Sequence, residues 1–121
     1  MTENDLELLD FRVIDLTSHI DPGVGAELSL STKSGISART AEPFDGTLYM
    51  YLKIRIAGQD ESLFLLDLTT ETIVRLPEGT AGVSDDDAPA CVAVAQRETY
   101  RAIRELTTAM GITPLDLSAA E

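Results

Sequence analysis

Residues 47–56 alternate strictly between apolar and polar side chains, and this alternation constrains the fold more than any other feature of the chain. Successive side chains of a β-strand point to opposite faces, so this period predicts a strand with one face in a core. The apolar positions are Leu48, Met50, Leu52, Ile54 and Ile56. We therefore expect the core to be built on a sheet.

Three further segments have strand-like patterns. The first, residues 6–16, alternates but loses its phase near Val13 and Ile14, which predicts a β-bulge there. The second covers residues 26–38, and the last covers residues 62–68 and continues in extended form to residue 76. The connections between these segments are short and rich in turn residues, which favours an antiparallel meander.

A long amphipathic helix is predicted after the strands. Ser84 and the acids 85–87 precede Pro89, a combination typical of a helix start. Apolar residues then recur at spacings of three and four, which predicts a helix of about twenty residues, and Gly111 supplies a stop. The predicted buried stripe is Val92, Ala95, Thr99, Ala102, Ile103, Leu106 and Met110. We expect one α+β domain over residues 1–121, a four-stranded antiparallel sheet with this helix packed on one face.

The charge balance excludes some classes of partner. The chain has 9 Lys and Arg against 21 Asp and Glu, a net charge of −12, and its basic residues are scattered in the sequence. A field of this sign repels phosphates, so neither nucleic acid nor a membrane surface is expected as a partner. The acidic N-terminus lacks signal-peptide character, no apolar run is long enough to span a bilayer, and a lone cysteine fits a reducing compartment, so we expect a cytoplasmic protein.

No group of residues in the sequence is typical of an active site. We interpret His19 as an exposed or capping residue in a loop, and Cys91 as a buried structural cysteine. The acids 85–87 are explained by helix capping, and one Cys with one His cannot form a zinc site. We expect no catalytic residue, no metal and no cofactor; a small enzyme built around His19 is the alternative that the residues leave open.

The predicted sheet has more apolar surface than one helix can cover. An antiparallel sheet normally leaves one face polar, yet the last strand is apolar on both sides and the 47–56 strand adds tyrosines to its second face. We expect a second subunit, a bound polypeptide, or both to cover this surface. The candidate partner-binding residues are Leu63, Leu65, Tyr49, Tyr51, Ile20 and Val24.

The order of the predicted elements resembles that of the SecB export chaperone and its SecB-like relatives, including those associated with toxin–antitoxin systems. Four strands, a glycine-containing loop and a long helix are followed by a closing Gly-x-x-Pro-Leu-x-Leu segment. The segments that carry the resemblance are residues 63–68, 73–79, 100–106 and 111–117. It covers residues 6–117, nearly the whole chain, and rests on the order and spacing of short motifs.

The resemblance implies a chaperone that needs neither ATP nor metal and assembles through its sheets as a homodimer or homotetramer. Its partners would be unfolded or partly folded polypeptides, or a toxin or antitoxin. It also implies that Asp15, Leu65 and Asp67 belong to a patch on which the protein-transport motor docks, although His19 replaces a further acid of that patch. Secretion chaperones of the family continue into another helix and a tail, whereas this sequence stops at Glu121, so we expect the fold to transfer better than the export role.

Two functional hypotheses follow from the sequence. The first is a SecB-like holdase that binds non-native polypeptide or a dedicated protein partner through apolar surface. The alternative is a non-catalytic interaction adaptor or accessory module of the same fold, without general chaperone or export activity.

Overall fold

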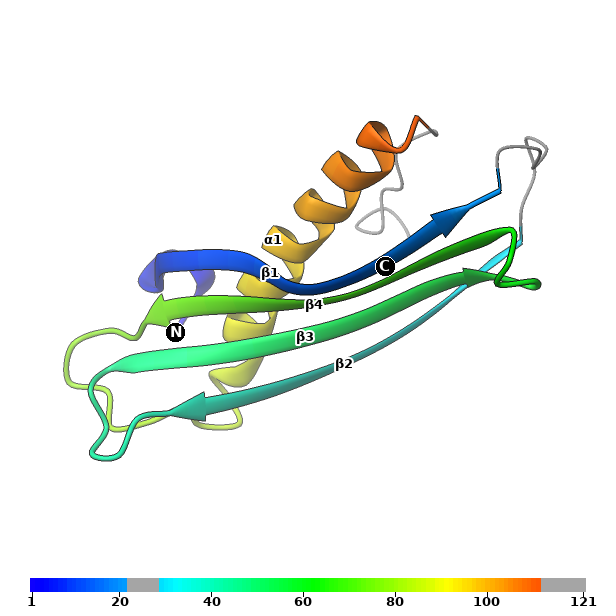
Figure 1. The fold of residues 1–121 in the computed structure, drawn as a ribbon. Coiled ribbons are helices and arrows are strands. Elements are labelled where there is room, and N and C mark those ends of the chain that lie inside the picture. Colours follow the sequence, from blue (N-terminus) through cyan, green and yellow to red (C-terminus); the bar gives the residue numbers. More distant parts are fainter. Residues whose placement is uncertain (22–28, 112–121) are drawn as a thin grey trace.

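The computed structural model describes residues 1–21 and 29–111 and has the α+β architecture that the sequence predicts. The four strands form one sheet, which Figure 1 shows as curved, with the helix lying across one face. In chain order the elements are the short 3₁₀ helix η1 (Glu3–Asp5), β1 (Glu7–Ile20), β2 (Leu30–Thr40), β3 (Thr47–Gly58), β4 (Phe64–Arg75) and α1 (Ala88–Ala109).

The sheet is antiparallel throughout, with the strand order β1-β4-β3-β2. Strands β2, β3 and β4 form the meander, and β1 lies outside β4, away from β2, its neighbour in the sequence (Figure 1). Both β1 and β2 are therefore edge strands, while β3 and β4 form the centre of the sheet.

Two irregularities interrupt the pairing of β1 with β4. The register shifts between Val13 and Asp15, so the predicted bulge near Val13 and Ile14 is confirmed. A second shift, between Leu8 and Asp10, was not predicted. Because β1 extends to Ile20, the expectation that His19 lies in a loop was wrong.

The other strands match their patterns closely. β3 contains the whole alternating segment and ends two residues beyond it. β4 is continuous from Phe64 to Arg75, because its polar residues 69–72 stay in register with β3. β2 begins at Leu30, and the part of its predicted strand between residues 26 and 28 lies outside the described residues.

The core lies between α1 and the even-numbered residues of β3 and β4. One cluster, near the start of α1, includes Met50, Val74 and Cys91, and a second cluster packs Ile54 and Phe64 against the later turns of the helix. Buried threonines separate the two clusters. The hydroxyls of Thr70 and Thr99 lie 2.8 Å apart, and the Thr72 hydroxyl has no hydrogen-bond partner among the described residues.

The ends of α1 follow the local signals in the sequence. Pro89 lies in the first turn, and Gly111, with φ of 79°, adopts the left-handed conformation that ends helices. The buried stripe differs from the predicted one, since Val92, Ala102, Leu106 and Met110 are only half-buried. The buried residues of α1 are Cys91, Val94, Ala95, Glu98, Thr99, Ile103 and Thr107. The stripe is rotated because α1 packs on β3 and β4, which leaves its flank toward β1 partly open.

Candidate functional site

The sheet face that points away from α1 is here called the open face. Register places five of the predicted partner-binding residues on it: Asp15, Leu65, Asp67, Tyr49 and Tyr51. Leu65, Asp67 and both tyrosines are half-buried, while Asp15 is exposed. The structure therefore brings these residues onto one surface, as the alternation of their strands requires.

The remaining three predicted residues lie elsewhere. Leu63 precedes β4 and is half-buried, with its carbonyl accepting a hydrogen bond from the Asp21 amide at 2.9 Å. Ile20 pairs with Phe64 and packs against the core on the α1 side, so it does not share the open face with Leu65. Val24 lies outside the described residues.

A polar network crosses the open face through all four strands. Nε of Arg12 in β1 donates to Oε1 of Glu71 in β4 at 2.8 Å. A hydrogen bond from Tyr51 in β3 and the Arg12 guanidinium lower the pKa of Glu71. Nε of Arg39 in β2 donates to the Tyr51 hydroxyl at 3.1 Å, and its guanidinium lies 4.4 Å from the ring centroid of Tyr49. Tyr49 and Tyr51 are therefore part of this polar network and do not form an apolar patch.

Asp67, which the family resemblance places in a motor-docking patch, is already engaged within the chain. Its Oδ2 atom accepts a hydrogen bond from Nη1 of Arg55 at 2.8 Å, and Nη2 of the same arginine lies 2.6 Å from Glu61. The two carboxylates, Glu61 first, raise the pKa of Arg55. The negative charge of Asp67 is therefore offset by a neighbour on the open face.

The largest concentration of exposed apolar side chains is on the edge strand β1, which sequence reasoning did not single out. Nine large hydrophobic residues of the described part are exposed, and five of them belong to β1: Leu8, Leu9, Val13, Ile14 and Leu16, at 38–46 % exposure. We call these five residues the apolar edge. Within the described residues the outer side of β1 has no partner strand. Proteins normally cover or charge such an edge, because it templates pairing with another chain.

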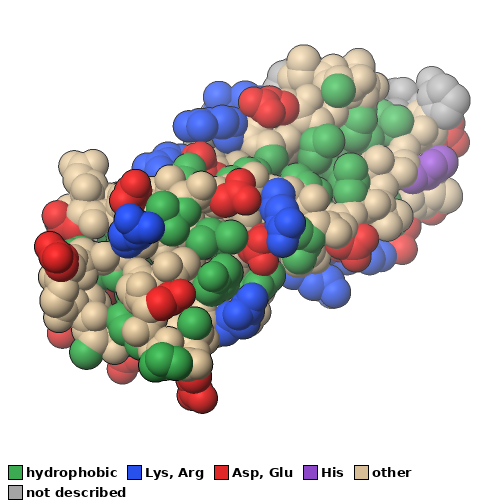
Figure 2. Space-filling model, turned by 60° about the vertical axis from the view of Figure 1, so that its left-hand side comes forward, with side chains coloured by type: hydrophobic (Ala, Val, Ile, Leu, Met, Phe, Trp, Pro, Cys, Tyr) green, Lys and Arg blue, Asp and Glu red, His purple; other side chains and the backbone are tan. Residues whose placement is uncertain are grey.

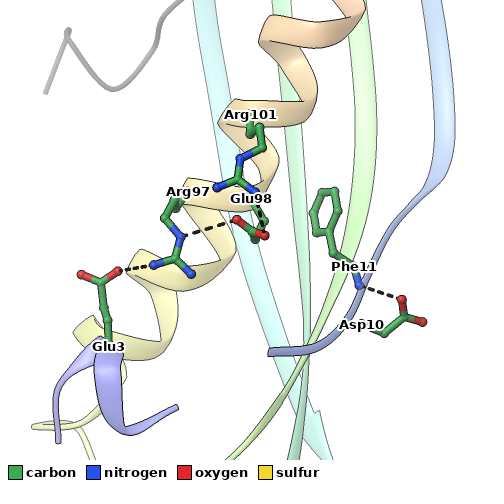
Figure 3. Close-up of polar contacts among 6 residues, drawn as sticks. All are labelled: Glu3, Asp10, Phe11, Arg97, Glu98 and Arg101. Atoms are coloured by element: carbon green, nitrogen blue, oxygen red, sulfur yellow. Dashed lines mark hydrogen bonds and ion pairs between the residues drawn. The ribbon is translucent and has the colours of Figure 1, made fainter. Parts of the chain in front are cut away.

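A groove continues the apolar edge toward the helix. It has a volume of about 340 Å³ and lies between Phe11 and Val13 of β1 and Ala102, Leu106 and Ala109 of α1. In Figure 3, Phe11 points from β1 toward the helix. The phase slip near Val13 and Ile14 was visible in the sequence, but the groove depends on β1 lying beside β4, which the sequence pattern does not specify.

Charged residues of α1 lie near the groove between β1 and the helix. The carboxylate of Glu98, only 9 % exposed, lies 3.5 Å from Arg97 and from Arg101, and Arg97 reaches Glu3 of η1 at 3.4 Å (Figure 3). This chain of ion pairs ties the N-terminal turn to the helix beside the groove. In Figure 2, hydrophobic side chains accordingly lie in patches between charged ones.

The residues considered for catalysis have structural roles here. Cys91 is 2 % exposed, and its burial raises the pKa of the thiol, as expected for a structural cysteine. Nε2 of His19 lies 2.7 Å from the Ser62 carbonyl, which fixes the β1 end beside the β3–β4 turn. Within residues 1–21 and 29–111, no cluster of His, Cys, Asp or Glu has the composition to hold a metal ion, and no helix is long and apolar enough to cross a membrane.

Comparison with known proteins gives a likeness of fold. No family model and no curated protein sequence matches the chain. Among solved structures, the chain is similar to the SecB-like chaperone Rv1957 of Mycobacterium tuberculosis, solved in complex with a ChAD peptide from the Rv1956 HigA1 antitoxin. The TM-score is 0.64 at 10 % sequence identity, and the match covers 93 % of this chain and 86 % of that chain. The sheet and helix of this chain therefore have the SecB-like fold.

Proposed function

We propose that this protein is an ATP-independent chaperone that holds non-native polypeptide, or a dedicated protein partner such as a toxin or antitoxin, on exposed apolar surface. The observation that carries the proposal is the apolar edge. An unpaired edge strand with five exposed large apolar residues can bind an extended polypeptide through main-chain hydrogen bonds and side-chain burial together.

The fold likeness supports a polypeptide as the class of ligand. The similar chaperone Rv1957 was solved with a peptide of an antitoxin. The groove beside Phe11 and Leu106 offers space for side chains of such a ligand next to the strand edge. Burial of apolar area would supply the affinity, at about 25 cal/mol per Å² before the entropy costs of association.

A second copy of the chain would compete for the same edge. We propose that the protein forms a homodimer or homotetramer, because two β1 edges can pair and bury their apolar residues against each other. The half-buried Leu65, Tyr49 and Tyr51 on the open face are a second proposed contact surface for a partner, and Leu63, which precedes β4, is a further proposed contact beside it.

The test is suppression of aggregation of an unrelated, chemically unfolded protein at stoichiometric ratios, followed by light scattering. Leu16→Asp and Ile14→Asp place charge on the apolar edge, and Val83→Asp is the matched control, since Val83 is similarly exposed but lies in the loop before α1. We expect the two β1 variants to lose most of the suppression and the control to retain it. Leu65→Asp tests the open face separately.

The outcomes separate the chaperone from the adaptor hypothesis. A wild-type protein that suppresses no aggregation, with a folded circular dichroism spectrum, contradicts the chaperone proposal. If it then still retains a defined partner from its host, and Leu65→Asp or Leu16→Asp abolishes that retention, a dedicated adaptor is the better description.

A further inference from the structure

Both lysines of the chain line one hollow on the open face. The sequence contains only Lys33 and Lys53 as lysines, and the strands carrying them are adjacent, with Gly35 paired to Lys53. The hollow has a volume of about 570 Å³ and is also lined by Arg55, Tyr51 and residues of β2. We call it the lysine hollow.

The charge of this region is opposite to that of the whole chain. β2 and β3 contain four basic residues, Lys33, Arg39, Lys53 and Arg55, and no acidic residue, although the chain carries 21 acids. Register places all four on the open face. Four of the nine basic residues, which are scattered in the sequence, are therefore brought together by strand pairing.

The two lysines differ from the neighbouring arginines in their partners. Arg55 is held by Asp67 and Glu61, and Arg39 is held by Tyr51. Neither Lys33 nor Lys53 forms an ion pair within the described residues, and both are exposed. Their positive charges are thus available to a ligand, whereas the charge of Arg55 is offset by two carboxylates.

Gly35 keeps the lysine hollow open. Its backbone is not in the left-handed region, and a Cβ added there would meet no atom within 4 Å. The conformation therefore does not require glycine at this position, and a larger side chain would project into the space beside Lys53. Ser34 and Ile36 also line the hollow, although register turns them to the α1 side, so the space reaches the outer edge of β2.

We propose that the lysine hollow binds an acidic polypeptide segment in extended conformation, with carboxylates at Lys33 and Lys53 and its backbone alongside the β2 edge. This proposal rests on the proposed function, which makes a polypeptide the ligand, and it adds that the bound segment is acidic. The charge complementarity favours carboxylates, and β2 is hydrogen-bonded on one side only within the described residues.

A nucleic acid fits this surface less well than a peptide. Its phosphates repeat along the whole strand, and beyond the lysine hollow they would meet Asp67 and Glu71 of β4 and Asp15 of β1. A peptide with two or three carboxylates can place them at the lysines alone. The net charge of −12 opposes a long polyanion in the same way.

The experiment uses the two lysines as reporters. Reductive ¹³C-methylation of the full chain labels Lys33, Lys53 and the N-terminus only, and the methyl signals are followed by NMR during titration with a short peptide in which Glu alternates with Thr and Val. The same peptide with Gln in place of Glu is the uncharged control. A single-stranded oligonucleotide is titrated in parallel.

We expect both lysine signals to shift with the Glu peptide and the N-terminal signal to stay unchanged. In a direct binding assay on the unmethylated protein, Lys33→Gln/Lys53→Gln should weaken the affinity roughly tenfold. Gly35→Val should also weaken it without loss of thermal stability, because it fills the hollow and leaves every charge in place. Arg75→Gln, which removes an exposed charge elsewhere on β4, should change the affinity by less than about twofold.

Equal binding of the Glu and Gln peptides, unchanged lysine signals, or tighter binding of the oligonucleotide would each overturn the proposal. The aggregation assay distinguishes failure of the lysine-hollow proposal from failure of the proposed chaperone function. A wild-type protein that suppresses aggregation normally but does not bind the Glu peptide rejects the lysine hollow alone. Specific binding of the Glu peptide without any suppression of aggregation rejects the chaperone role alone.

Discussion

Arg12 and Glu71 form an ion pair of 2.8 Å between an edge strand and a central strand, with the carboxylate only 7 % exposed. The pair is the first link of the network that continues through Tyr51 to Arg39 on the opposite edge of the sheet. It is also located between the two bulges of β1, where pairing with β4 is regular. Contacts between Arg12, Glu71, Tyr51 and Arg39 therefore link each strand to its neighbour across the whole open face.

Replacement of Glu71 should reveal how much this network stabilises the sheet. We expect Glu71→Gln to lower the free energy of unfolding at pH 7 by about 1–2 kcal/mol, because a charge-assisted hydrogen bond is weakened and Arg12 loses its partner. Urea unfolding measures the change. Glu105→Gln, at an exposed position of α1, is the matched control and should have little effect.

The same residue should contribute to acid sensitivity. The pKa of Glu71 is lower in the folded protein than its ordinary value, so the folded state binds fewer protons there than the unfolded state. The stabilisation is fully present above about pH 5 and is lost as the pH falls below the ordinary glutamate value near 4.3 through the lower folded pKa. The unfolding free energy of Glu71→Gln should therefore depend less on pH in this window than that of the wild type. An identical pH dependence below pH 5 would contradict the role given to Glu71.

The buried hydroxyl pair between Thr70 of β4 and Thr99 of α1 should fix the helix on the sheet. Thr99→Val removes the 2.8 Å hydrogen bond and leaves Thr70 with only a 3.5 Å contact to the Leu52 carbonyl. We expect a loss of about 1–2 kcal/mol in unfolding free energy. The double variant Thr70→Val/Thr99→Val should lose less than the sum of the single variants, and strict additivity would show that the hydroxyls do not interact.

Cys91 should react only after unfolding. The side chain is 2 % exposed in the first turns of α1 and packs in the core cluster with Met50 and Val74, and burial raises the pKa of its thiol. We expect slow labelling by a thiol reagent under native conditions and complete labelling in denaturant. Labelling of the native protein as fast as that of a free thiol would place Cys91 outside the core.

The oligomeric state tests the proposed role of the β1 edge in self-association. Sedimentation at micromolar concentration should show a particle of at least twice the 13.0 kDa chain mass. Ile14→Asp and Leu16→Asp should shift it toward the monomer, because each places a charge where a second β1 would pack. A wild-type monomer under these conditions would contradict the proposed assembly.

Strand β3 and the ends of α1 could be predicted because their signals are local. The alternation of residues 47–56 determines which side chains share a face, whatever the strand pairs with. Pro89 and Gly111 act through their own backbone geometry, and the bulge near Val13 is a phase slip within one strand. The absence of acids from residues 30–40 and 47–58 was a further local signal, and it could have indicated the basic surface.

The sequence by itself therefore determined the element types, the faces of the central strands and the α+β class. Tertiary structure decided that β1 pairs with β4, that α1 is rotated toward β3 and β4, and that Lys33 and Lys53 meet at one hollow. The physical reason is that these relationships depend on contacts between residues far apart in the chain. Strand register and helix packing select among several pairings that satisfy the same local pattern, and that choice creates both the apolar edge and the lysine hollow.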